Sequence, residues 1–163
     1  MSTTTLPIAK AITLGLRDAM RADDRVMMMG EDIGVLGGVF RVTDGLHAEF
    51  GDLRVVDTPL AEAAIVGTAV GLAVRGYRPV VEIQFDGFVF PAFSQITTQV
   101  AKMHNRTKGR VRMPIVIRIP HGGGIGAIEQ HSESPEALFA HTAGLRILAP
   151  ADSQDAYWMT RQA

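Results

Sequence analysis

Several polar residues of this sequence follow short apolar runs and could take part in acid–base or binding chemistry. They are Glu31, the Asp57-Thr58 pair, Glu62, Gln84 and His131. In an open parallel sheet, ligands lie beyond the carboxyl ends of the strands. We therefore expect these side chains, which come from separate connections, to converge on one edge of a sheet.

Glu62 is a candidate for proton transfer. It stands in the first turn of a predicted helix, where the helix dipole alone would favour a carboxylate. Its neighbours Ala61, Ala63, Ala64 and Ile65 are apolar, so we expect partial burial. Burial raises the pKa of an unpaired carboxyl, and such a group can exchange a proton with a nitrogen base. Position alone leaves a stabilising role and a catalytic role open.

His131 is a candidate proton acceptor. It follows a glycine-rich stretch, Gly122 to Gly126, and precedes a helix start at Ser134-Pro135-Glu136. Glycines let backbone approach a ligand closely, although this spacing matches neither the Rossmann nor the Walker pattern. Phe88, beside Asp86-Gly87 at a strand-to-helix connection, could stack against a flat heterocycle.

The elements that must position these residues alternate between helices and strands. The sequence predicts helices after Thr5, at Leu46–Phe50, Ala61–Val74 and Phe93–Met103, and from Ser134 and Asp152. It predicts strands at Val26–Met29, Val55–Val56, Pro79–Phe85, Ile115–Ile119 and Arg146–Leu148. This alternation indicates an α/β fold, with a mostly parallel sheet covered by helices on both faces.

Composition bounds the class of protein. The chain has 163 residues and a net charge of −1, which favours neither nucleic acid nor a membrane as partner. The absence of cysteine excludes disulfides, thiolate nucleophiles and cysteine zinc sites. The apolar Ala61–Val74 helix is too short to span a bilayer, and no targeting segment is visible. We expect a cytoplasmic protein.

The last predicted helix reaches the end of the chain without a stop signal. It starts at Asp152 and still has Ala156, Tyr157 and Met159 to bury at Ala163. We therefore expect the domain over residues 1–163 to be incomplete at its C-terminus, with a second domain missing.

Six short motifs occur in order along the chain. They are Gly30-Glu31-Asp32-Ile33-Gly34, Gly37-Gly38-Val39-Phe40-Arg41-Val42-Thr43, Asp57-Thr58-Pro59-Leu60-Ala61-Glu62, Glu82-Ile83-Gln84-Phe85, Phe90-Pro91-Ala92-Phe93 and His131-Ser132-Glu133-Ser134-Pro135-Glu136. Together they resemble the β subunit of the decarboxylating component of 2-oxo acid dehydrogenases, most closely the branched-chain (2-oxoisovalerate) type. The resemblance implies a transketolase-like pyrimidine-binding domain without the family's C-terminal transketolase-type domain. The implied enzyme is 3-methyl-2-oxobutanoate dehydrogenase.

The resemblance also implies roles for individual residues. Glu62 would hydrogen-bond a ring nitrogen of thiamine diphosphate and promote the imino form that removes the thiazolium proton. The cofactor would be lined by Glu31, Leu60, Ala61, Gln84 and Phe88. The substrate would be bordered by Phe85, Asp86, Gly87, Phe88 and His131. His131 would accept a proton and assist acyl transfer to a lipoyl group, with Gln130 where close relatives often have a second histidine.

The sequence has no Gly-Asp-Gly and no Asn pair, the device that holds magnesium and diphosphate in thiamine-diphosphate enzymes. The resemblance therefore implies that this chain has no metal site for magnesium. It implies instead that an α subunit holds the metal in a heterotetramer. A lipoyl-bearing acyltransferase would be a further partner. The first carbonyls of a potassium site would lie near Met113 to Val116. Alone, the chain would be inactive. Two alternatives stay open: a pyruvate or acetoin dehydrogenase β subunit, or an inactive fragment that only binds a partner.

Overall fold

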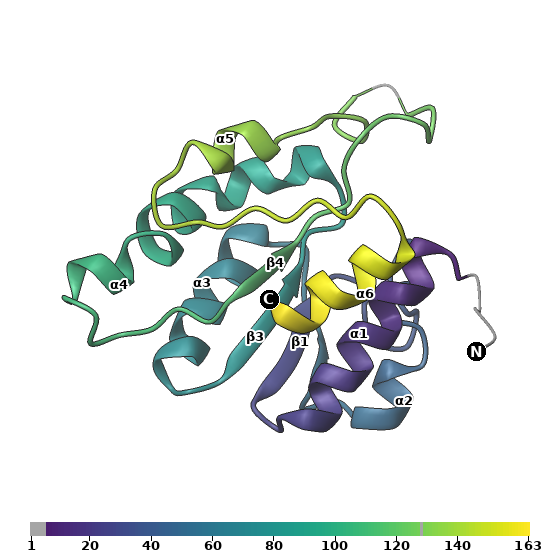
Figure 1. Cartoon of the computed structure of the whole chain (residues 1–163), viewed down its shortest axis with the longest axis horizontal. Coiled ribbons are helices and arrows are strands. Elements are labelled where there is room, and N and C mark those ends of the chain that lie inside the picture. Colours follow the sequence, from purple (N-terminus) through teal and green to yellow (C-terminus); the bar gives the residue numbers. More distant parts are fainter. Residues whose placement is uncertain (1–5, 128) are drawn as a thin grey trace.

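A parallel four-stranded sheet forms the centre of the molecule (Figure 1). The structure is a computed structural model that describes residues 6–127 and 129–163. Its strands are β1 (Val26–Gly30), β2 (Val55–Asp57), β3 (Arg78–Glu82) and β4 (Val116–Arg118), in the order β2-β1-β3-β4. Gly30 pairs with Asp57 and with Glu82, and Glu82 pairs with Arg118. The last residues of all four strands are therefore level at one edge of the sheet.

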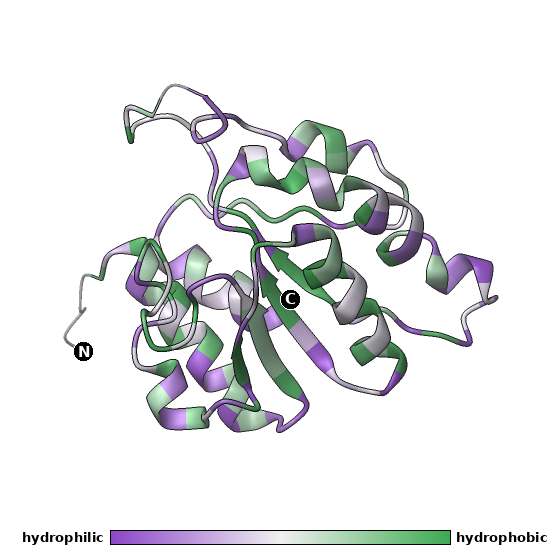
Figure 2. Cartoon of the chain, turned by 180° about the vertical axis from the view of Figure 1, so that it is seen from behind, coloured by the Kyte–Doolittle hydropathy of each residue, from purple (hydrophilic) through white to green (hydrophobic). Residues whose placement is uncertain are grey.

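Helices cover both faces of this sheet. Successive residues of a strand point to opposite sides, so each strand contributes side chains to the core on either face. Met28 of β1 packs in a core with α1 (Ile8–Ala22), whereas the next residue, Met29, packs in a second core with α3 (Glu62–Val74). Figure 2 shows hydrophobic residues concentrated in the central strands and in the helix surfaces against them. The predicted α/β architecture is confirmed.

The last helix, α6 (Ser153–Gln162), packs along α1 (Figure 1). The two backbones come close at Gly15, where a Cβ would lie 3.0 Å from the Cβ of Thr160. The Tyr157 hydroxyl donates a hydrogen bond of 2.7 Å to Asp18 of α1. The predicted start is confirmed, since the Asp152 carboxylate accepts the N–H of Asp155 at 2.8 Å.

The chain becomes helical earlier after β3 than the sequence indicates. Of the helix predicted over residues 93–103, the structure forms a π-helix η2 (Gln95–Val100), preceded by a 3₁₀ helix η1 (Asp86–Ala92) and followed by α4 (Met103–Arg106). The Phe88 N–H donates to the Phe85 carbonyl at 3.1 Å and closes the first of these turns. The remaining helices, α2 (Leu46–Phe50) and α5 (Glu136–Ala140), lie where the sequence predicts helices.

Two further local predictions are wrong, and one lies outside the described residues. Arg146–Leu148 is not a strand, because an extended segment becomes a strand only when its backbone pairs with a neighbour. This exposed segment has no such pairing among the residues that the structure describes. The N-cap of α5 is Pro135 rather than Ser134, with no side-chain capping bond. Thr5, after which the first helix is predicted, is not among the described residues.

Within residues 6–127 and 129–163, no helix has both the length and the apolar character needed to cross a membrane.

Candidate functional site

Two buried carboxyl groups lie where β1 and β2 end. Glu31 follows β1 directly, and Glu62 is the first residue of α3, after β2. Each residue is only 6% exposed. Within the described part of the chain, neither carboxyl oxygen of Glu31 has a hydrogen-bond partner. The predicted burial of Glu62 is confirmed, and Glu31 is a buried acid with no hydrogen bond of normal geometry in the described part of the chain.

The electrostatics of Glu31 show that the two carboxyl groups interact. Burial, and next to it the negative charge of Glu62, raises the pKa of the Glu31 carboxyl above its ordinary value. The nearby charge of Asp32 acts in the same direction, and the backbone of Ala61 opposes part of the rise. A group that donates hydrogen bonds to this pair would relieve the cost of burying it.

Backbone contacts between the strand ends hold this part of the site. The Gly34 N–H donates to Oδ1 of Asp57 at 2.6 Å, and the Thr58 N–H donates to the Gly30 carbonyl at 2.9 Å. A side chain at Gly34 would collide with the Asp57 carboxylate. The Asp57-Thr58 pair, a candidate from sequence, therefore joins the β1 and β2 connections.

Three other residues predicted to line a cofactor, Leu60, Ala61 and Gln84, lie close in sequence to the ends of β2 and β3. Ala61 is the N-cap of α3, and Leu60 beside it is 75% exposed. Gln84, two residues beyond β3, donates from Nε2 to the Asp32 carboxylate at 3.0 Å. This bond ties the end of β3 to the loop that follows Glu31.

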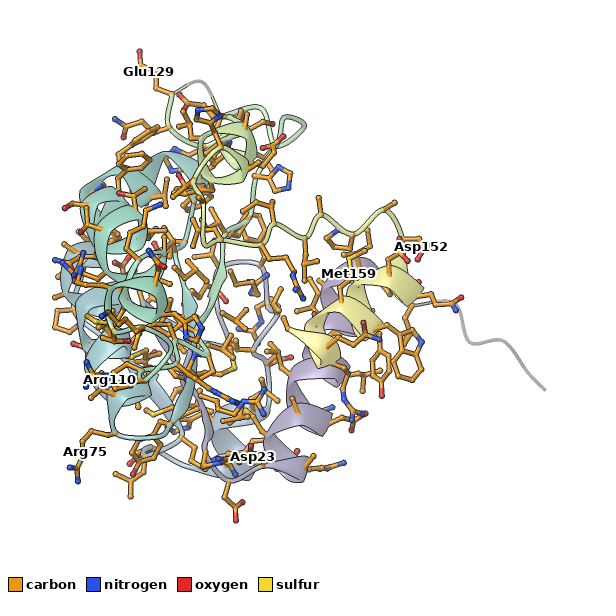
Figure 3. The ribbon with its side chains drawn as sticks, turned by 60° about the vertical axis from the view of Figure 1, so that its left-hand side comes forward. Asp23, Arg75, Arg110, Glu129, Asp152 and Met159 are labelled. Carbon is orange, nitrogen blue, oxygen red and sulfur yellow. The ribbon has the colours of Figure 1, made fainter. Side chains whose placement is uncertain are left out.

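Three rings predicted to border a substrate are in mutual contact. The centroid of the His131 ring lies 4.1 Å from that of Phe85 and 5.1 Å from that of Phe88, and the two phenylalanine centroids are 5.7 Å apart. His131 Nδ1 lies 2.7 Å from the carbonyl oxygen of Glu129. Because a carbonyl can only accept, Nδ1 carries the hydrogen, and Nε2 of the neutral ring is left as an acceptor. Figure 3 shows the Glu129 side chain pointing outward from this loop.

A cavity of about 120 Å³ lies beside His131. Its lining consists of Phe40, Phe85, Pro120, His121, Gly122, Gly123, Ile125 and His131. Glu31 and Glu62 do not line it, so the predicted residues form two groups, a carboxyl pair and an aromatic–histidine group. Gln84 and Phe85 are consecutive residues that belong to one group each, which places the two groups at the same edge of the sheet.

Sequence reasoning missed two features of the site. Phe40 packs edge-on against Phe85, with centroids 5.6 Å apart, and closes one side of the cavity. Glu82 is 1% exposed and forms an ion pair of 2.7 Å with Arg118 on the neighbouring strand. The sequence did offer a signal for this pair. Glu82 and Arg118 each stand in an apolar strand run, and a charged residue that is buried there requires a partner.

The family described as "Transketolase, pyrimidine binding domain" matches residues 4–163. The chain belongs to this family. A split-gene transketolase, described as an inactive beta4 tetramer, has the same fold with a TM-score of 0.75 and 18% sequence identity, over 98% of this chain and 48% of that one.

Curated relatives of the domain are dehydrogenase β subunits. The chain is 70% identical over 158 residues to "Pyruvate dehydrogenase E1 component subunit beta" of Leifsonia xyli, which covers 97% of this chain and 47% of the relative. It is 56% identical over 161 residues to "3-methyl-2-oxobutanoate dehydrogenase subunit beta" of Mycobacterium tuberculosis, with 99% and 46% covered. The "2-oxoisovalerate dehydrogenase subunit beta" of Bacillus subtilis is 45% identical over 153 residues, with 94% and 47% covered. The chain thus spans about half the length of the curated relatives it matches.

Proposed function

We propose that this chain is the pyrimidine-binding part of the β subunit of a thiamine-diphosphate-dependent 2-oxo acid dehydrogenase. The observation that carries the proposal is the buried pair Glu31 and Glu62 at the sheet edge, with both oxygens of Glu31 lacking a partner within the described residues. Relatives named as dehydrogenase β subunits, which share 45% to 70% of its residues, support the same function.

The residues present fit the pyrimidine end of the cofactor. An aminopyrimidine ring offers N–H donors and a basic nitrogen, and N–H donors are what the buried Glu31 carboxyl lacks within the described residues. Glu62 would hold the ring nitrogen through its carboxyl, and Glu31 would accept a hydrogen bond beside it. Leu60, Ala61, Gln84 and Phe88 would line the remaining surface. When bound, thiamine diphosphate supplies the electron sink for loss of carbon dioxide.

The role proposed for Glu62 is to hold and return a proton at the ring nitrogen. Glu62 is the first residue of α3 and is 6% exposed, and exclusion of water strengthens the hydrogen bond of such a carboxyl to a base. This role requires a carboxyl group, because an amide of the same shape cannot transfer the proton.

His131 is proposed to accept and return a proton near the reacting carbon during acyl transfer to a lipoyl group. Its Nδ1 hydrogen is directed at the Glu129 carbonyl, which leaves Nε2 as the acceptor. Phe85 and Phe88 fix the plane of the ring. General base catalysis by such a group is worth roughly 10²–10⁴-fold in rate.

Branched-chain 2-oxo acids are the proposed substrates, which makes the whole enzyme a 3-methyl-2-oxobutanoate dehydrogenase. Phe40, Phe85 and Ile125 contribute apolar side chains to the cavity beside His131, which an aliphatic side chain could contact. Pyruvate is the second candidate, because the relative at 70% identity is named a pyruvate dehydrogenase subunit.

The partners remain part of the proposal. An α subunit would supply the magnesium and diphosphate site, since this sequence has no Gly-Asp-Gly motif. A heterotetramer in the cytoplasm, a lipoyl-bearing acyltransferase and a potassium ion near Met113–Val116 complete the proposed assembly.

Reconstitution tests this function. The full-length β subunit, combined with its α partner, thiamine diphosphate and magnesium, should decarboxylate 2-oxoisovalerate in the presence of an artificial electron acceptor. A kcat/KM for 2-oxoisovalerate above that for pyruvate supports the branched-chain assignment, and the reverse order assigns the enzyme to pyruvate. No decarboxylation of either acid by a fully assembled complex would refute the proposed function.

A further inference from the structure

Asp86 is a carboxyl group only 1% exposed, and it directly follows Phe85, which lines the cavity. It is the first residue of η1. Its Oδ1 accepts the N–H of Gly87 at 3.0 Å, and its Oδ2 accepts the N–H of Glu133. Both carboxylate oxygens are therefore engaged by backbone N–H groups, one of them 47 residues away along the chain.

Gly87 makes a second contact with the same distant segment. Its N–H donates to the carbonyl of Gln130 at 3.2 Å. A Cβ on Gly87 would lie 2.6 Å from the Cα of Gln130, so only glycine allows this approach. Gln130 itself has a left-handed backbone with φ of 63°. Asp86 and Gly87 thus hold the backbone immediately before and two residues after His131.

Residues 85–88 provide both the hydrogen bonds to the backbone of residues 130–133 and the contacts with the His131 ring. Phe85 and Phe88, which touch the His131 ring, flank Asp86 and Gly87 in sequence. The direction of the His131 ring therefore depends on a rigid connection between its backbone and this segment.

We propose that Asp86 is a positioning residue that fixes His131, acting through the backbone of Gly87 and Glu133 rather than by touching the substrate. Its carboxylate and the Gly87 N–H form a clasp that holds residues 130–133 against η1. The geometric part of this inference stands on the contacts alone. Its consequence for turnover rests on the function proposed above for His131.

Asp86→Ala and Asp86→Asn in the full-length subunit, assembled with its α partner, test the clasp. Hydrogen bonds to a charged acceptor stabilise by enough to slow amide exchange roughly 10- to 100-fold. The Glu133 amide should therefore exchange roughly 10- to 100-fold faster in Asp86→Ala, with Asp86→Asn between it and the wild type. Amides of the β1 strand should keep their protection, which distinguishes local opening from unfolding.

Two matched variants complete the experiment. Asp24→Asn, at a side chain 99% exposed, should change neither exchange nor turnover. Gly87→Ala should reproduce the Asp86→Ala exchange pattern, because its Cβ forces Gln130 away. The NMR signals of the His131 ring should lose the ring-current shift caused by Phe85 in both clasp variants, a change that a general loss of stability does not produce.

Turnover separates this inference from the proposed function. If the clasp acts through His131, Asp86→Ala should lower acyl transfer in the wild type but cost nothing further in a His131→Ala background. Unchanged Glu133 exchange and His131 shifts in Asp86→Ala would overturn the clasp, whatever the activity. Full activity of His131→Ala would instead refute the proposed role of His131 while the exchange data still report on the clasp.

Discussion

Arg118→Met should destabilise the fold more than any change at an exposed arginine. Arg118 contacts the Glu82 carboxylate through Nη2 at 2.7 Å and Nε at 3.2 Å, and the Glu82 side chain is 1% exposed. Removing the guanidinium would leave a buried carboxylate without its cation. Such a loss costs about 3–5 kcal/mol, which corresponds to a fall of roughly 6–20 °C in the melting temperature of a domain of this size.

Urea unfolding followed by circular dichroism measures this cost, with Arg112→Met at an exposed position as the control. The double variant Glu82→Gln, Arg118→Met should recover part of the loss, because it removes the uncompensated charge. Glu82 pairs with Gly30, the residue before Glu31, so the damage should also reach the carboxyl pair. A difference below about 1 kcal/mol between Arg118→Met and Arg112→Met would refute the reasoning, since that is the range of an exposed ion pair.

Two further predictions concern the carboxyl pair and the cofactor. The pKa of Glu31 is raised in the folded chain, so folding binds its proton and the free energy of unfolding falls as pH rises from the unfolded pKa towards the folded one. Glu31→Gln should therefore gain stability over the wild type at about pH 7. The gain should shrink as the pH falls towards about pH 3, where Glu31 is protonated in both the folded and the unfolded chain; equal differences in urea midpoint at both pH values would contradict this. Calorimetry should show that this chain alone binds thiamine diphosphate weakly or not at all, because it lacks the Gly-Asp-Gly motif, and micromolar magnesium-dependent binding would show otherwise.

The parts of the fold that local patterns determine were predictable. Val26–Met29 is an apolar run of strand length between polar turns, and the structure contains it as a buried central strand. The position of Glu62 at the start of α3 follows from the helix pattern, and its burial follows from its apolar neighbours. The strand predicted at Arg146–Leu148 failed because apolar composition does not provide a pairing partner.

The contacts between distant segments could not be predicted from the sequence. The pairing of Glu82 with Arg118 depends on the register between β3 and β4. Local sequence patterns do not determine that register. The attachment of Glu133 to Asp86 joins a side chain to a backbone N–H, and any residue except proline can supply that donor. Motifs placed Phe85, Phe88 and His131 near one substrate, but only the structure shows their rings in contact.

The central claim is that Glu62 controls a proton on the bound cofactor. Its most direct test is the rate at which the thiazolium C–H exchanges with deuterium in the assembled full-length enzyme, compared between the wild type, Glu62→Gln and the control Glu49→Gln on the surface helix α2. The account predicts intact assembly and exchange at least roughly 100-fold slower in Glu62→Gln, with Glu49→Gln equal to the wild type. An unchanged exchange rate in an assembled Glu62→Gln enzyme would contradict it.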